Sequence, residues 1–220
     1  MNFGIQIKGI TIADAWEGLV RTCLEDGVSL STGRDIRAGT LSLLGGQIII
    51  EEPLAEPMVS DKFVNDRAFC ETYALEYLLL DTIQPGEDYT YGNQIHKNEQ
   101  LDKCIKRMKE NPYLRTFCLE VGEPSLFGAN DPPCLRLVDF RVVDNALHTF
   151  FYFRSWDIFK AANANLVGIA RLAEYVAKEV GGLEVGQLIG FFKDAHIYEK
   201  DLEYVREVFR PKSVYGNKKD

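Results

Sequence analysis

A cysteine follows two prolines in the segment Asp131-Pro-Pro-Cys-Leu-Arg136. The prolines restrict the backbone ahead of Cys134, which begins a predicted strand and can project its side chain from the strand end. A cysteine attacks an electrophile through its thiolate, so a neighbouring group must stabilise negative charge. A strand cysteine is more commonly a core residue, and Cys134 becomes a candidate nucleophile through the polar residues that follow it in the chain.

An arginine and a serine stand at Arg154-Ser155, where the second strand of a predicted hairpin ends. The hairpin covers residues 134–154 and turns at Asp144-Asn145, which brings Arg154 beside Cys134. A guanidinium there can hold a phosphate through two parallel hydrogen bonds and favour the thiolate. An arginine at a strand end with no such neighbour is only a solvated charge.

An amide and a His/Tyr pair come further along. Asn165 directly precedes an apolar helix, where it either caps the helix or offers its amide to a ligand. A side-chain amide both donates and accepts, which complements the adjacent N3–H and O4 of a uracil ring. His196 and Tyr198 lie two residues apart after a strand, so in an extended chain their side chains face the same side. Together they could hold a sugar hydroxyl, whereas each alone is more commonly a surface or core residue.

The composition excludes several classes of protein. The chain has 220 residues, of which 46% are hydrophobic, and we expect a single domain over residues 1–220. The net charge of -8 argues against general binding to nucleic acid or to an anionic membrane. No apolar run reaches the roughly 18 residues that span a bilayer, and no basic-then-apolar segment predicts a signal peptide.

The five cysteines indicate a protein of the reducing cytoplasm. Their number is odd and no CxxC pair occurs, so neither a zinc ribbon nor a dithiol motif is predicted, and we expect no metal. Cys23, Cys70 and Cys104 fall on apolar faces of predicted helices and are interpreted as small core residues.

The spacing of apolar residues predicts a mixture of helices and strands. Helices are predicted over residues 11–26, 67–80, 98–110, 166–180 and 201–209, and strands over residues 40–50, 115–121, 134–143, 147–154 and 188–193. Gly45-Gly46 indicates a bulge or bend within the first of these strands. The segments 51–62 and 122–133 are predicted loops.

Seven short motifs occur in an order that resembles the thymidylate synthase family. They are Gly39-Thr-Leu-Ser42, Tyr91-Gly-Asn-Gln94, Asn111-Pro-Tyr-Leu-Arg115, Pro133-Cys134, Arg154-Ser-Trp-Asp157, Asn165 eight residues beyond Asp157, and His196-Ile-Tyr198. Each motif alone is a weak signal, and their common order carries the resemblance, which is clearest over residues 89–200.

The resemblance implies a fold and an activity. The fold would be α+β (mixed α/β), the thymidylate synthase fold, with one large mixed sheet packed against helices and against the mate in a homodimer. The activity would be reductive methylation of dUMP to dTMP. The one-carbon donor would be 5,10-methylene-tetrahydrofolate or 5,10-methylene-tetrahydromethanopterin.

The resemblance also implies a role for each matching residue. Cys134 would add to C6 of dUMP, and Asn165 would bind the uracil. Arg154 and Ser155 would bind the phosphate, and His196 and Tyr198 would bind the sugar 3′-hydroxyl. Asp157 would contact the pterin. Arg115 would reach the phosphate of the nucleotide bound by the other subunit.

The chain departs from the family at several positions. The phosphate-loop arginine is replaced by Asp35, and Arg34 or Arg37 could substitute for it, with Arg37 the residue we expect. The segment that holds the family's general-acid glutamate is abbreviated. We expect Glu76 to be that residue, with Glu71 as its rival. The closing C-terminal tail has no counterpart, and this shortened form resembles archaeal thymidylate synthases.

Three alternatives stay open at this point. A hydroxymethylase acting on dUMP or dCMP would share the addition step but let water capture the methylene carbon. A Cys/His hydrolase would need His148 or His196 within hydrogen-bond reach of Cys134. A non-catalytic nucleotide-binding relative would form no covalent adduct with 5-fluoro-dUMP.

Overall fold

One mixed sheet organises the molecule. The computed structural model describes residues 3–31, 39–128 and 131–210. The strands are β1 (Ile5–Gly9), β2 (Val28–Ser31), β3 (Gly39–Ile50), β4 (Phe117–Glu120), β5 (Leu135–Val143), β6 (Ala146–Phe153), β7 (Trp156–Asp157) and β8 (Glu184–Tyr198). Their order is β1-β3-β8-β6-β5-β4, with β2 beside β3 and β7 beside β8. The long strand β8 is central, because it runs antiparallel to β3 and parallel to β6.

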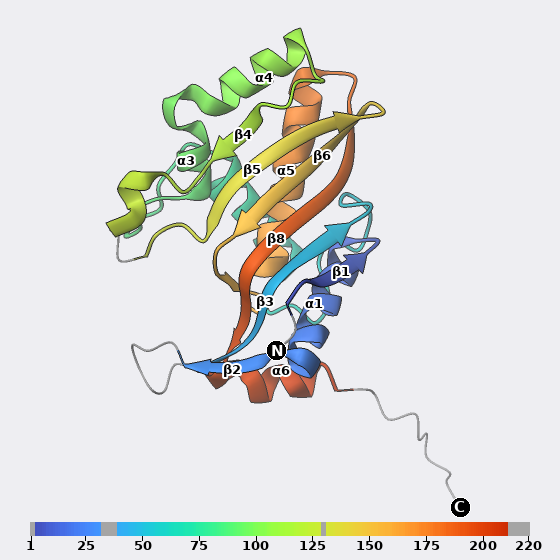
Figure 1. The fold of residues 1–220 in the computed structure, drawn as a ribbon, viewed down its shortest axis with the longest axis vertical. Helices are drawn as coiled ribbons and strands as arrows, with labels where there is room; N and C mark the ends of the chain where they lie inside the picture. Colours follow the sequence, from blue (N-terminus) through green and yellow to red (C-terminus); the bar gives the residue numbers. More distant parts are fainter. Residues whose placement is uncertain (1–2, 32–38, 129–130, 211–220) are drawn as a thin grey trace, which may run out of the picture.

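Two helices pack on one face of this sheet. Figure 1 shows α5 (Ala162–Val180) behind β6 and β8, and α1 (Ile12–Asp26) behind β1 and β3. The other helical segments are α2 (Arg67–Tyr73), the π-helix η1 (Ala74–Leu79), α3 (Tyr91–His96), η2 (Lys97–Glu99), α4 (Gln100–Glu110), η3 (Pro124–Gly128), η4 (Glu199–Asp201) and α6 (Leu202–Val208). Within the described ranges, no helix is long and apolar enough to cross a membrane.

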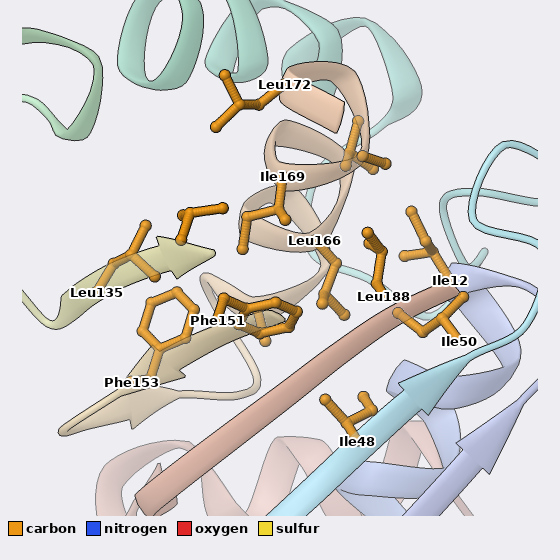
Figure 2. Close-up of a cluster of buried hydrophobic side chains, with 14 of the residues drawn as sticks. Ile12, Ile48, Ile50, Leu135, Phe151, Phe153, Leu166, Ile169, Leu172 and Leu188 are labelled. Carbon is orange, nitrogen blue, oxygen red and sulfur yellow. The ribbon is translucent and has the colours of Figure 1, made fainter. Parts of the chain in front are cut away.

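The core fills the space between α5 and the sheet. Leu166 and Ile169 of α5 lie toward Phe151 of β6 and Leu188 of β8, and all four are fully buried (Figure 2). Burial of each such side chain contributes roughly 1.5–3 kcal/mol. Helix α5 is therefore fixed against the strands that carry the candidate site residues.

Several predictions from the sequence are confirmed. The predicted fold class holds, with one large mixed sheet packed against helices. Thr11 caps α1 through a reciprocal pair of hydrogen bonds with Asp14. The hairpin turns at Asp144 and Asn145, whose φ angles of 48° and 64° are those of the tight turn that suits twisted strands.

Other elements differ from the prediction. The helix predicted over residues 67–80 is α2 followed by the π-helix η1. Helix α5 begins at Ala162, so Asn165 lies inside it and is not its cap. Helix α4 begins later than predicted, because Asn98 and Glu99 have positive φ angles. Strand β8 extends to Tyr198, so His196 lies within a strand. The sequence patterns did not predict β1, β2, β7 or α3.

Candidate active site

The hairpin joins Cys134 to Arg154, as predicted. The backbone N–H of Arg154 donates to the carbonyl oxygen of Cys134 at 2.9 Å. The Arg154 side chain turns back onto the same loop, where Nε donates to the Pro133 carbonyl at 3.1 Å and Nη2 donates to the Pro132 carbonyl. Arg154 Nη2 also lies 3.7 Å from Asp131 Oδ1. The guanidinium thereby fixes the segment that carries the candidate nucleophile.

The thiol of Cys134 lies in an environment of opposing effects. The side chain is half-buried, and burial raises its pKa above the ordinary value. The positive charges of Arg154 and Arg136 act the other way and lower this pKa, while Asp131 raises it. Burial is the largest of these effects, so the pKa of Cys134 is raised overall. A further positive charge would be needed to favour the thiolate strongly at neutral pH.

The amide of Asn165 is held in one orientation. The indole Nε1–H of Trp156 donates to Asn165 Oδ1 at 2.9 Å, and Asn165 Nδ2 donates to the Tyr73 hydroxyl at 2.7 Å. An indole N–H can only donate, so the amide oxygen must face Trp156. The amide is almost fully buried, with Asn165 4% exposed. These two hydrogen bonds use one N–H and one oxygen lone pair and leave one of each unused.

His196 and Tyr198 stand together at the end of β8. Their rings meet edge to face with centroids 5.0 Å apart, which confirms that they share one side of the strand. His196 Nδ1 lies 3.4 Å from Asp194 Oδ1. The pKa of Tyr198 is raised by burial and then by the negative charges of Asp157 and Cys134.

A cavity of about 330 Å³ opens beside this cluster. It is lined by Tyr73, Tyr77, Gly86, Glu87, Asp88, Tyr89, Thr90, Tyr91 and Asp131. The rings of Tyr73 and Tyr77 are stacked, with centroids 4.7 Å apart and planes 9° from parallel. Burial raises the pKa of Tyr91, as do the nearby Tyr73 and Cys134. The cavity therefore extends from Asp131, three residues before Cys134, to the aromatic face of α2 and η1.

The tyrosines of this cavity were given no role from the sequence. Tyr91 belongs to a quoted motif, and Tyr73 and Tyr77 share one apolar face of a predicted helix. Spacing of four residues puts two side chains on one helix face, but it does not say whether that face meets the core or a cavity. The four-residue spacing of the two tyrosines was the available signal.

Asp157 and Ser155 lie near the end of β6, and the described hydrogen bonds of the Asp157 side chain do not involve the other candidate site residues. Asp157 Oδ1 accepts from the backbone N–H groups of Phe159 and Lys160, at 3.2 and 3.0 Å, and Asp157 is paired with His196 across β7 and β8. Ser155 is half-buried between β6 and β7. Their ligand-binding roles stay predictions.

Two further arginines, Arg115 and Arg37, were predicted to reach phosphate. Arg115 is exposed immediately before β4. Arg37 lies outside the described residues. For both, contact with a nucleotide stays a prediction.

The two candidate glutamates differ in their surroundings. Glu71 accepts hydrogen bonds from Arg171 at 2.7 and 2.9 Å and from Arg67 at 2.6 Å. Arg171 foremost, and then Arg67, lower its pKa, which disfavours the protonated form that a general acid needs. Glu76 is half-buried on η1, near Tyr77, and its role as the general acid stays a prediction.

The histidines give little support to a Cys/His hydrolase. His148 Nδ1 accepts from the backbone N–H of Gln187 at 3.2 Å, near the turn end of β6, whereas Arg154 follows its other end. His196 is engaged with Asp194 and Tyr198.

Comparison with known proteins identifies the family of this chain. The family profile described as thymidylate synthase matches residues 15–214. A protein of Methanothermobacter thermautotrophicus named "Putative thymidylate synthase" is 33% identical over 232 residues, covering 96% of this chain and 100% of the relative. A Methanosarcina barkeri protein of the same name is 30% identical, covering 95% of this chain and 96% of the relative. A Listeria monocytogenes protein named "Thymidylate synthase" is 37% identical over 110 residues, covering 50% of this chain and 35% of the relative.

The chain therefore belongs to the thymidylate synthase family. Enzymes of this family are methyltransferases that act on dUMP with a methylene-folate-type co-substrate. The resemblance drawn from the seven motifs is confirmed, and family membership favours methylation over hydroxymethylation and over a non-catalytic role.

Proposed function

We propose that this chain converts dUMP to dTMP with Cys134 as the nucleophile and Asn165 as the residue that binds the base. The observation that carries the proposal is the fixed amide of Asn165. Its oxygen faces Trp156 and its nitrogen faces Tyr73, so its free lone pair and free N–H complement N3–H and O4 of uracil. Cytosine presents the opposite pattern and is disfavoured.

The reaction begins with covalent addition. The Cys134 thiolate forms a bond to C6, and the C5–C6 π electrons move onto C5 and O4 as an enolate. C5 then acts as the nucleophile toward the methylene carbon. The donor would supply both that carbon, whose two bonds to donor nitrogens break, and the hydride that converts it to a methyl group. Loss of the C5 proton and elimination of Cys134 return the thiolate and give dTMP, while the donor leaves oxidised by two electrons.

The other side chains bind the rest of the nucleotide. Arg154 and Ser155 hold the phosphate, assisted by Arg37, and the negative phosphate displaces the proline carbonyls from part of the Arg154 guanidinium. His196 and Tyr198, which are already in contact, hold the sugar 3′-hydroxyl. Arg115 supplies a third cation, from the partner subunit.

The donor shares the tyrosine-lined cavity with the uracil ring, because its methylene carbon must lie next to C5. Stacked aromatic rings suit a flat pterin, and Asp157 completes this site from β7. The chemistry of the cavity is compatible with methylene-tetrahydrofolate and with methylene-tetrahydromethanopterin.

The enzyme works as a homodimer in the cytoplasm. Alternate residues of β6 are half-buried on the face away from α5, and Phe191 of β8 is 43% exposed, so this face of the sheet offers apolar surface to a mate. The reducing compartment is supported by the five cysteines, all of which are free thiols.

Product mass tests the proposal. The protein is incubated with dUMP and each methylene-tetrahydropterin in turn, and the nucleotide is weighed. A gain of one CH₂ unit supports methylation. A gain of CH₂O identifies a hydroxymethylase, and unchanged dUMP with both donors would refute the proposed activity.

A further inference from the structure

Tyr73 makes a contact that neither the sequence motifs nor the family assigns. It is the last residue of α2, at the point where this helix passes into the π-helix η1. Its hydroxyl lies 2.7 Å from Asn165 Nδ2. The side-chain nitrogen of an asparagine can only donate, so the tyrosine oxygen is the acceptor. The proton of the Tyr73 hydroxyl is therefore free to donate to a third group.

That third group would lie in the cavity. Tyr73 lines it together with Tyr91 and Asp131, and Asp131 stands three residues before Cys134. Tyr73 is half-buried as a whole, but its hydroxyl lies at the buried end of the ring, against Asn165. Burial raises the pKa of Tyr73, so the hydroxyl keeps its proton and acts as a donor at every pH at which the enzyme would work.

We propose that Tyr73 is a catalytic residue whose hydroxyl donates a hydrogen bond to O4 of the uracil ring, beside the free N–H of Asn165. The proposal rests on the proposed function. When Cys134 adds to C6, the C5–C6 π electrons delocalise onto O4, and two fixed donors then face the oxygen on which negative charge develops. Tyr73 retains its proton throughout, so no acid or base has to be regenerated at this position.

Tyr73 lies in the segment where the family's general-acid glutamate is expected, and this segment is abbreviated here. The family resemblance predicted a general-acid glutamate, with Glu76 as the expected residue and Glu71 as its rival. Glu71 is engaged by Arg67 and Arg171, which leaves it ionised, and an ionised carboxylate cannot donate. Tyr73 is the described side chain that bonds the nitrogen of Asn165, so it occupies the position from which a donor can reach O4.

The test uses the substitution Tyr73→Phe. Phenylalanine keeps the ring that stacks on Tyr77 and removes one hydroxyl, so the fold is expected to survive. The matched control is Tyr175→Phe, which removes a hydroxyl from α5 at a position outside the cavity. Three quantities are compared with the wild type: the dissociation constant of dUMP, the rate at which the C5 hydrogen of dUMP exchanges with D₂O without a donor, and kcat for dTMP.

The expected loss is in rate and not in binding. Loss of one donor to a developing oxyanion typically lowers kcat by about 10²–10³-fold. Tyr73→Phe should slow C5 exchange and kcat by roughly that factor and change dUMP affinity by less than about threefold, while Tyr175→Phe resembles the wild type. The C5 exchange readout depends on formation of the enolate, which a merely structural role of Tyr73 would not affect selectively.

The outcomes separate this inference from the proposed function. Exchange within about threefold of the wild type in Tyr73→Phe, with dTMP still formed, would overturn the role of Tyr73 and leave the function standing. A fall in dUMP affinity that matches the fall in rate, or a melting temperature too low for the assay, would reduce Tyr73 to a support for Asn165. A wild type that neither exchanges C5 hydrogen nor forms dTMP would overturn both.

Discussion

Trp156 donates its indole N–H to Oδ1 of Asn165 at 2.9 Å, and this hydrogen bond determines which way the buried amide points. An amide free to rotate by half a turn could pair with uracil or with cytosine, because its donor and acceptor would exchange places. The donor-only character of the indole removes that freedom. Under the proposed role of Asn165, base selectivity would therefore depend on a residue that need not touch the base.

Trp156→Phe should relax the preference for uracil. Phenylalanine retains an aromatic ring against Phe153, on which the indole stacks at 4.5 Å, but it cannot orient the amide. A mismatched buried polar group costs about 1–3 kcal/mol, so the ratio of kcat/KM for dUMP to that for dCMP should fall by roughly ten- to a hundredfold. The control is Trp16→Phe, which also removes a buried indole hydrogen bond, to the Ile158 carbonyl, away from Asn165. An equal fall in both variants would contradict the prediction.

The sequence predicted the part of the site that depends on local chain geometry. The hairpin that joins Cys134 to Arg154 follows from strand patterns and from a turn whose residues adopt positive φ angles. The contact between Tyr73 and Asn165 joins residues 92 positions apart, and no local pattern encodes it. Asn165 resembled a helix cap because the apolar pattern starts at Leu166, whereas buried Ala162 and Ala164 extend α5 by one turn.

The short strands β1 and β7 were not predicted from the sequence for a related reason. Strand β1 pairs in parallel with β3, and β7 consists of two residues paired with β8, so each is stabilised by a neighbour distant in the chain. A strand of this length shows too few residues for alternation to be recognised. The family resemblance did not depend on recognising these strands, because it rests on the order of seven short motifs along the chain.

Arg154→Gln should shift the reactivity of Cys134 to higher pH. Burial already raises the pKa of this thiol, and the Arg154 charge opposes that effect. Removal of the charge therefore raises the pKa further, so less thiolate is present at any neutral pH and alkylation slows. Iodoacetamide labelling across pH, with the modified peptides identified by mass spectrometry, measures this. Cys118 serves as an internal reference, because burial and neighbouring acids raise its pKa to about 11 without a contribution from Arg154. A parallel shift of both cysteines, or no shift, would contradict the prediction.

Arg115 should act in the active site of the other subunit. It is exposed two residues before β4, whose first residue Phe117 pairs with Phe140, toward the turn end of β5 and away from Cys134. Arg115→Ala and Cys134→Ser homodimers should each be inactive, and a heterodimer of the two should regain activity, because one of its two sites combines an intact thiol with an intact arginine. Co-expression with two different affinity tags isolates the heterodimer for assay. A monomer in sedimentation, or inactive heterodimers of proven composition, would exclude a composite site.

Cys134→Ser should abolish turnover and preserve substrate binding. A serine hydroxyl has nearly the shape of the thiol, so the proposed contacts of dUMP with Arg154, Asn165, His196 and Tyr198 should be retained. The hydroxyl is, however, a far weaker nucleophile near neutral pH. Calorimetry with dUMP should give a dissociation constant close to that of the wild type. The matched control is Cys118→Ser, at an exposed position on β4, which should retain full activity. Denatured wild-type protein should carry the added mass of 5-fluoro-dUMP and donor, and the Cys134→Ser protein should not. More than a few per cent of wild-type activity in Cys134→Ser would falsify the assignment of the nucleophile, because a serine cannot replace the thiolate and another group would have to attack. The assignment itself rests on the Pro-Pro pair that presents this thiol at the start of β5.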